Sequence, residues 1–142
     1  MHENPFIAMA LAMLASLFLN SAHAQDKQKV VYHVTEAERV QFVLGNIENH
    51  IRGVGGPDKV EIVLVAHGPA LKAFEKKEAQ SGLLDRVAEL KNKGVNFDAC
   101  GNTLRNNRTT LSDLIDGFAR VDQGGVVRIV ELQQQGYIYL RP

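Results

Sequence analysis

The apolar residues of this chain fall into short continuous runs separated by longer stretches of mixed character. Residues 29–34 (KVVYHV) and 60–66 (VEIVLVA) are apolar almost throughout, which is typical of strands that are buried on both faces. Residues 95–100 alternate between apolar and polar positions, and they predict a third strand that ends at Cys100. Residues 126–132 and 137–140 are predicted as the fourth and fifth strands.

Between the predicted strands the apolar residues recur at intervals of three and four, which is the spacing of amphipathic helices. The first helix ends near residue 52, before a cluster of glycines, and its inner stripe is Val40, Val43, Leu44, Ile47 and Ile51. Shorter helices are predicted to begin near residues 70 and 83. Thr110 and Asp113 have the spacing of a capping box, so they predict a helix that continues to Phe118.

This order of elements predicts one three-layer α/β domain over residues 25–142, with a mostly parallel five-stranded sheet and helices on both faces. The turn at residues 134–136 is short enough for a hairpin, so the last two strands are predicted to be antiparallel. Ligands bind beyond the carboxyl ends of the strands in such sheets. We therefore expect Thr35, His67 and Cys100, each at the end of a predicted strand, to share one edge.

The first 24 residues have the pattern of a secretory signal peptide. The apolar run at residues 6–19 is short for a membrane span, and Ala22 and Ala24 provide the small residues that a signal peptidase requires. We expect cleavage before Gln25, a periplasmic location and no membrane association afterwards. The segment before the apolar run has no Lys or Arg, which leaves an uncleaved anchor or a different start codon as alternatives.

The charge balance argues against two classes of partner. The chain has 16 basic and 16 acidic residues, so it lacks the positive excess that nucleic acids and anionic membranes attract. It also has no Trp and few aromatic residues on which bases or sugars would stack. Neither nucleic acid nor a membrane surface is a predicted partner.

The chemistry of the chain centres on Cys100, its only cysteine. A single cysteine cannot form an internal disulfide, and in a secreted protein it indicates an intermolecular bond or a free reactive thiol. A buried cysteine that serves as a small apolar residue is the alternative. A polar loop is predicted directly after Cys100, and its candidate binding residues are Gly101, Asn102, Thr103, Arg105 and Arg108.

Three segments resemble the DsrE/DsrF-like family of sulfur-relay proteins, in particular its secreted and largely uncharacterised branch. They are VAHGPAL after the second strand, GVNFDACGNTL around Cys100, and GGVVRIVELQQQGYIYLRP at the end, and the resemblance covers about residues 29–142. It implies a parallel-rich α/β fold and assembly into trimers or hexamers. Members that act in sulfur transfer carry sulfur as a persulfide on one cysteine, and Cys100 matches that position.

A persulfide carrier needs an accessible thiolate that cations or amide dipoles stabilise. Gly101 would let backbone amides approach Cys100, Arg105 and Arg108 would add positive charge, and Asp98 would oppose ionisation. His67 is a candidate base or oxyanion donor, with a simple loop histidine as the alternative.

The residues favour neither a nucleophilic triad nor a metal site. His33, His67 and Cys100 lack the local spacing of known metal ligands, and no cofactor is predicted.

Two hypotheses of function follow. The first is a periplasmic sulfur-trafficking protein that exchanges sulfane sulfur with a donor or acceptor protein through Cys100. The second is a non-catalytic ligand-binding or assembly module, which would tolerate Cys100→Ser. A homo-oligomer is expected under both, because Tyr137 and Tyr139 share one face of the last strand and could cover a sheet edge.

Overall fold

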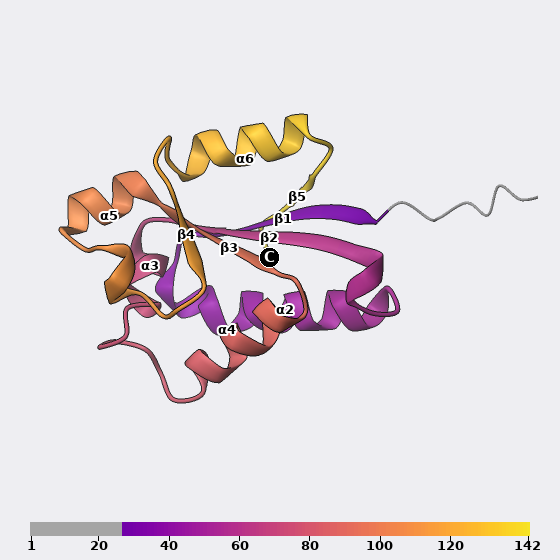
Figure 1. Ribbon diagram of the computed structural model, residues 1–142, viewed down its shortest axis with the longest axis horizontal. Coiled ribbons are helices and arrows are strands. Elements are labelled where there is room, and N and C mark those ends of the chain that lie inside the picture. The colour runs from indigo at the N-terminus through magenta and orange to yellow at the C-terminus, as the bar shows by residue number, and fades with distance from the viewer. Residues whose placement is uncertain (1–26) are drawn as a thin grey trace, which may run out of the picture.

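The computed structural model describes residues 27–142, so the signal peptide predicted at residues 1–24 lies outside the described residues. A sheet of five parallel strands runs through the centre of the molecule in the order β4-β3-β2-β1-β5 (Figure 1). The strands are β1 (Gln28–Val34), β2 (Val60–Ala66), β3 (Asn96–Cys100), β4 (Phe118–Val121) and β5 (Ile138–Leu140).

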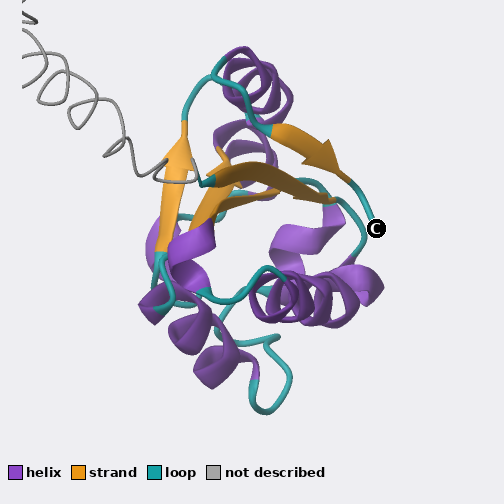
Figure 2. Ribbon diagram, turned by 90° about the vertical axis from the view of Figure 1, so that its right-hand side faces the viewer, coloured by secondary structure: helices purple, strands orange, loops and turns teal. Residues whose placement is uncertain are grey.

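Helices cover both faces of the sheet, as predicted. Helices α2 (Val40–Gly53) and α4 (Leu83–Asn92) lie on one face, and α6 (Gly125–Gln134) lies on the other (Figures 1 and 2). The remaining short helices are η1 (Ala37–Arg39), η2 (Pro57–Lys59), α3 (Pro69–Ala73), α5 (Gly101–Asn107) and η3 (Leu111–Asp113). None of the helices between residues 27 and 142 has the length and apolar character that a membrane span requires.

Two apolar clusters form the core, one on each face of the sheet. The larger cluster joins α2 and α4 to alternate residues of the strands, such as Tyr32 and Leu64. The smaller cluster, on the α6 side, consists of Val31, Val63, Val65, Ile129, Leu132 and Tyr137. Because successive strand residues point to opposite faces, both clusters draw on β1 and β2, and this explains why those strands are apolar throughout.

The prediction of a fourth strand at residues 126–132 is wrong, because these residues form α6. The segment is rich in β-branched residues, but its burial follows the helical period: Ile129 and Leu132 are buried, whereas Val126, Val127 and Val130 are exposed. The actual fourth strand, Phe118–Val121, occupies the end of the region predicted as a helix. The capping box of Thr110 and Asp113 does form, but it caps only the single turn of η3.

The predicted C-terminal antiparallel hairpin is also wrong. Strand β5 pairs in parallel with β1, with Val30 opposite Ile138 and Tyr32 opposite Leu140. Since residues 125–134 are helical, the turn after them connects a helix to a strand and not one strand to its neighbour. Helix α6 thus carries the chain from β4, at one edge of the sheet, to β5 at the opposite edge (Figure 1).

Candidate functional site

The structure brings His67 and Cys100 together at the carboxyl edge of the sheet. Strands β2 and β3 are neighbours, with Ala66 opposite Ala99, so the residues that follow in each strand are at the same level. Gly125 packs against both residues: a Cβ at that position would be 3.4 Å from the Cβ atoms of both Cys100 and His67. The start of α6 therefore closes over a site formed by the ends of two strands.

The thiol of Cys100 is held by backbone amides. The N–H of Gly125 donates to Sγ at 3.1 Å, and only 5% of the cysteine is exposed. Burial raises the pKa of the thiol, but hydrogen bonds from the backbone N–H groups of Thr103 and Gly125 outweigh it, so the pKa is lowered. The segment predicted as a polar loop is helix α5, whose first turn supplies the Thr103 amide.

Glycines permit the close packing of α5 and α6 around the thiol. A Cβ at Gly101 would lie 2.8 Å from the carbonyl oxygen of Val121, at the end of β4. A Cβ at Gly124 would lie 2.5 Å from the side-chain nitrogen of Asn102, and Gly124 also has a φ of 95°, which other residues rarely adopt. A side chain at position 101 would push α5 away from the end of β4, and one at position 124 would displace the side chain of Asn102.

A histidine pair adjoins the thiol. Nε2 of His67 and Nε2 of His33 are 2.6 Å apart, and Nδ1 of His33 is 2.7 Å from the hydroxyl of Tyr139. Burial, followed by the charges of His67 and Arg141, lowers the pKa of His33 to about 4, although Glu36 acts in the opposite direction. Burial and then Arg141 also lower the pKa of His67, so both rings are neutral at neutral pH.

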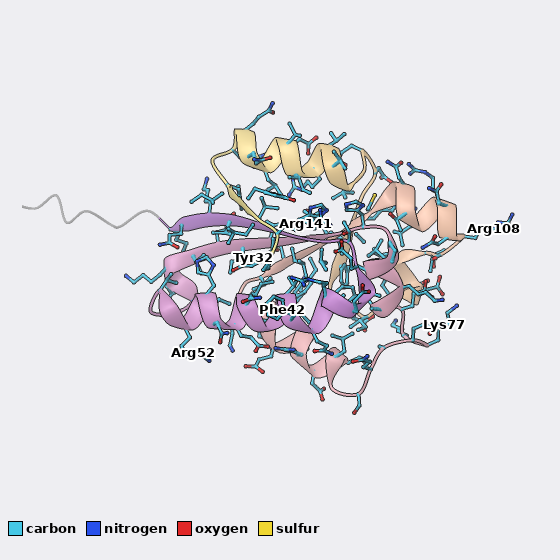
Figure 3. The ribbon with its side chains drawn as sticks, turned by 180° about the vertical axis from the view of Figure 1, so that it is seen from behind. Tyr32, Phe42, Arg52, Lys77, Arg108 and Arg141 are labelled. Carbon is cyan, nitrogen blue, oxygen red and sulfur yellow. The ribbon has the colours of Figure 1, made fainter. Side chains whose placement is uncertain are left out.

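The predicted arginines form no hydrogen bond with the thiol. Arg105 bonds to Asn102 within α5, and Arg108 ends that helix in a left-handed conformation with a φ of 54°. Figure 3 shows Arg108 at the outer tip of the molecule, far from Arg141. Neither guanidinium donates a hydrogen bond to Cys100, so their predicted role in binding stays a prediction.

The cation whose charge acts on both histidines is Arg141. Its guanidinium donates to Thr35 Oγ1 at 2.9 Å and to Glu36 at 2.5 Å. Thr35 thus lies at the same sheet edge as His67, as predicted from the strand ends. Thr103, the remaining binding candidate, accepts the backbone N–H of Gly68 with its hydroxyl at 2.9 Å and so ties α5 to the loop that carries His67.

Asp98 does not leave an unpaired negative charge beside the thiol. Its buried carboxylate accepts from Nε of Arg128, on α6, at 2.7 Å. This ion pair offsets the effect on Cys100 that the sequence led us to expect from Asp98.

Sequence reasoning missed four parts of the site: His33 as a partner of His67, Gly125, Tyr139 and Arg141. His33 was considered only as a metal ligand, although it stands one residue before the end of β1 and the rule of strand ends applies to it. Gly124 and Gly125 look like a turn before a strand. Had residues 125–134 been recognised as a helix, its first amides would have been placed beside the strand ends.

The candidate site does not have the side chains that a metal ion would need as ligands. Within residues 27–142, no group of three His, Cys, Asp or Glu side chains is arranged to hold one. The Nε2 atoms of His33 and His67 are 2.6 Å apart, which leaves no room for an ion between them.

Residues 3–142 match the model of the DsrE/DsrF-like family. The chain belongs to the DsrE/DsrF-like family. This membership suggests a role in sulfur relay.

Solved structures share the fold. A protein of unknown function from Methanobacterium thermoautotrophicum is 32% identical, with a TM-score of 0.71 over 82% of this chain and 100% of its own. The ychN protein from E. coli is 16% identical, with a TM-score of 0.66 over 81% and 99%. A conserved protein of unknown function from Bacteroides thetaiotaomicron is 16% identical, with a TM-score of 0.60 over 87% and 100%. No functionally curated protein matches the chain.

Proposed function

We propose that this DsrE/DsrF-like protein traffics sulfane sulfur and holds it as a persulfide on Cys100. The observation that carries the proposal is the environment of Sγ. It accepts the Gly125 N–H at 3.1 Å and lies where two helices begin, so backbone amides stabilise the thiolate and lower the pKa of the thiol. The sulfur-relay role that family membership suggests supports the same chemistry.

The proposed loading step is a displacement at sulfur. The Cys100 thiolate attacks the outer sulfur of a persulfide donor R–S–SH, a new S–S bond forms, and the donor S–S bond breaks with its electron pair leaving on R–S⁻. In unloading, an acceptor thiolate attacks the outer sulfur of Cys100–S–SH, and the Cys100 thiolate is the leaving group. Neither step needs an oxidant or a reductant, and the same amides stabilise the thiolate as nucleophile and as leaving group.

His67 is the proposed base for the Cys100 thiol. Its depressed pKa keeps the ring neutral at neutral pH, so that one ring nitrogen can accept a proton. The buried thiol favours a donor with a slender terminal sulfur, such as a hydropolysulfide, over a bulky one. A donor or acceptor protein would have to present its sulfur on an extended segment.

Intact mass spectrometry tests the proposal. The mature protein is incubated with a polysulfide donor beside Cys100→Ser, and each sample is measured before and after a thiol reductant. We expect the wild-type protein to gain the mass of one sulfur atom, to lose it on reduction, and the variant to gain none. A wild-type protein that gains no sulfur, and whose Cys100 resists small thiol reagents until it is unfolded, would refute the proposal.

The second hypothesis, a non-catalytic assembly or ligand-binding module, is favoured by two observations. Cys100 is buried, and large apolar side chains on α6 and β5 are exposed. They are Val126, Val127, Val130 and Ile138. Under this hypothesis Cys100→Ser retains every function of the protein.

We also propose that the protein is a homo-oligomer, a trimer or a hexamer, as the family resemblance implies. The exposed valines of α6 and the open edge of β5 support this proposal. Light scattering of the mature protein should give the mass of a trimer or larger, and a monomer at high concentration would contradict it.

A periplasmic location is proposed from the pattern of residues 1–24. Fractionation of cells that express the full chain, with mass analysis of its N-terminus, should recover a protein that begins at Gln25 in the periplasmic fraction. Recovery of the full chain in the membrane would indicate an uncleaved anchor.

A further inference from the structure

Three side chains from neighbouring strands form a continuous line of hydrogen bonds that ends beside Cys100. Tyr139, on the edge strand β5, bonds to His33 on β1 at 2.7 Å, and His33 bonds to His67, just after β2, at 2.6 Å. Tyr139 and His33 are 106 residues apart in sequence. The sheet order places their strands side by side, with β1 between β5 and β2.

The geometry of the histidine pair fits an N–H···N hydrogen bond. The ring centroids are 4.7 Å apart, the ring planes differ by 12°, and the two Nε2 atoms are 2.6 Å apart. The centroid distance exceeds the nitrogen distance by almost two ring radii, so each Nε2 lies close to the line between the centroids. The rings therefore meet edge to edge, and the N–H of one points at the lone pair of the other.

Such a line has two states. In one, Tyr139 donates to Nδ1 of His33, His33 donates through Nε2 to His67, and His67 carries its proton on Nδ1. In the other every bond is reversed: His67 donates through Nε2, His33 donates through Nδ1 to the phenol oxygen, and Nδ1 of His67 is bare. The two states differ in which end of the line is ready to release a proton.

We propose that His33 and Tyr139 are positioning residues that relay protons between His67 and solvent while sulfur is loaded on and unloaded from Cys100. The inference rests on the proposed function. Nδ1 is bonded to Cγ and lies nearer to Cβ than Nε2 does, and a Cβ on Gly125 would be 3.4 Å from the Cβ atoms of both His67 and Cys100. Because Nε2 of His67 is engaged with His33, Nδ1 is the ring nitrogen left to accept the proton of Cys100.

Loading moves one proton outward. The Cys100 thiol gives its proton to Nδ1 of His67, whose Nε2 proton passes to Nε2 of His33. The Nδ1 proton of His33 passes to the Tyr139 oxygen, and the phenol releases its own proton to water. The donor's leaving thiolate takes up a proton from solvent, so the overall balance closes.

Unloading reverses the line. The acceptor thiol loses a proton to solvent as it attacks, and the relay returns a proton to Cys100. Each transfer therefore prepares the state that the next one needs.

The surroundings suit a relay of neutral groups. The low pKa of both rings means that no lasting extra proton occupies the line at neutral pH. The charged groups that act on the pair are Arg141 and Glu36, which are bonded to each other at 2.5 Å. On the α6 side, Arg128 is paired with Asp98. Tyr139 is 38% exposed, so its hydroxyl oxygen, at the far end of the line, lies on a side chain that meets water.

The test is the single-turnover rate of persulfide formation, trapped by alkylation and measured by mass, for the wild-type protein, Tyr139→Phe and Tyr137→Phe. Tyr137 is the matched control, because its hydroxyl bonds to Glu61 and not to a histidine. We expect Tyr139→Phe to load about tenfold more slowly, as fits the loss of part of an acid–base device. Tyr137→Phe should load at the wild-type rate.

The isotope effect separates a relay from a structural role. The loading rate is measured in mixtures of light and heavy water and plotted against the fraction of deuterium. For the wild-type protein the plot should be curved, because several protons move together. For Tyr139→Phe it should be a straight line. In His33→Ala, added imidazole should restore part of the lost rate.

Equal rates and equal isotope curves in Tyr139→Phe and the wild-type protein would overturn the relay and leave the persulfide function standing. A wild-type protein that forms no persulfide would overturn both. The two failures are therefore distinguishable.

Discussion

The two faces of the sheet differ in how completely apolar side chains cover them. The face under α2 and α4 is covered by a continuous apolar core in which residues such as Leu44 and Leu64 have no exposed surface. The α6 face has only six clustered apolar residues. It also holds two of the three buried polar side chains found in residues 27–142, His33 and Asp98, and Sγ of Cys100 is bonded to α6. The face under α2 and α4 therefore provides most of the apolar core, whereas the α6 face carries the polar residues of the candidate site.

Alanine substitutions on the two faces should show the largest contrast. Leu44→Ala, on α2, removes a fully buried side chain and should cost about 3–5 kcal/mol of unfolding free energy. Ile129→Ala, on α6, removes a side chain that is 7% exposed and packs in the smaller cluster, so it should cost about 2 kcal/mol or less. Urea unfolding followed by circular dichroism measures both. Equal losses would show that the two faces contribute alike.

The second largest effect should come from acid, which should lower the free energy of unfolding through His33 on the α6 face. The pKa of His33 is about 4 in the folded protein, whereas that of an unperturbed histidine is about 6.5, so the unfolded chain binds the proton more tightly. The contribution of a neutral His33 is therefore complete above pH ~6.5, falls as the pH drops toward ~4, and amounts to about 3 kcal/mol at most. His33→Gln cannot titrate, so its unfolding free energy should depend less on pH over this range. The same slope in the variant and the wild-type protein would contradict the assigned burial of His33.

The glycine contacts of the site predict a smaller effect. Gly101→Ala places a Cβ 2.8 Å from the carbonyl oxygen of Val121, a backbone atom that cannot turn away, so we expect a loss of about 1–3 kcal/mol. Gly53→Ala, at the end of α2, is the matched control because nothing lies within 4 Å of its Cβ. The control should be neutral or slightly stabilising. Thermal unfolding of both variants measures the difference, and a neutral Gly101→Ala would mean that α5 can move away from β4 at little cost.

The same division between faces explains how much the sequence could predict. The first three strands and helices α2 and α4 have long and regular apolar patterns, because each contributes to the large core, and they lie close to where the patterns place them. Strand β4 has only four residues, two of them exposed, and could not be distinguished from the end of a helix. Helix α6 buries only one stripe, and its β-branched residues favoured a strand.

Only the site residues that follow directly from the ends of predicted strands could be located from the sequence. Ends of parallel strands meet at one edge, and this rule located His67 and Cys100. The pairing of His33 with Tyr139 depends on β5 lying next to β1, which no local pattern contains. Gly125 was not predicted as part of the site, because the helix that it begins was predicted as a strand. Contacts between residues that a crossover connection brings together could therefore not be predicted from the sequence. The positions of residues at the ends of strongly patterned strands could be predicted.

The smallest effect on stability should come from Cys100→Ser, the substitution with the largest effect on the proposed function. A serine hydroxyl is close in size to the thiol and can accept the Gly125 N–H in place of Sγ, so we expect a change within about 1 kcal/mol. Persulfide formation should be lost completely. Unfolding and intact mass measured on the same preparation test both expectations. Cys100 is also a member of the larger apolar cluster. If the variant were as unstable as Leu44→Ala, packing in that cluster would be the main role of Cys100, and the non-catalytic hypothesis would be preferred.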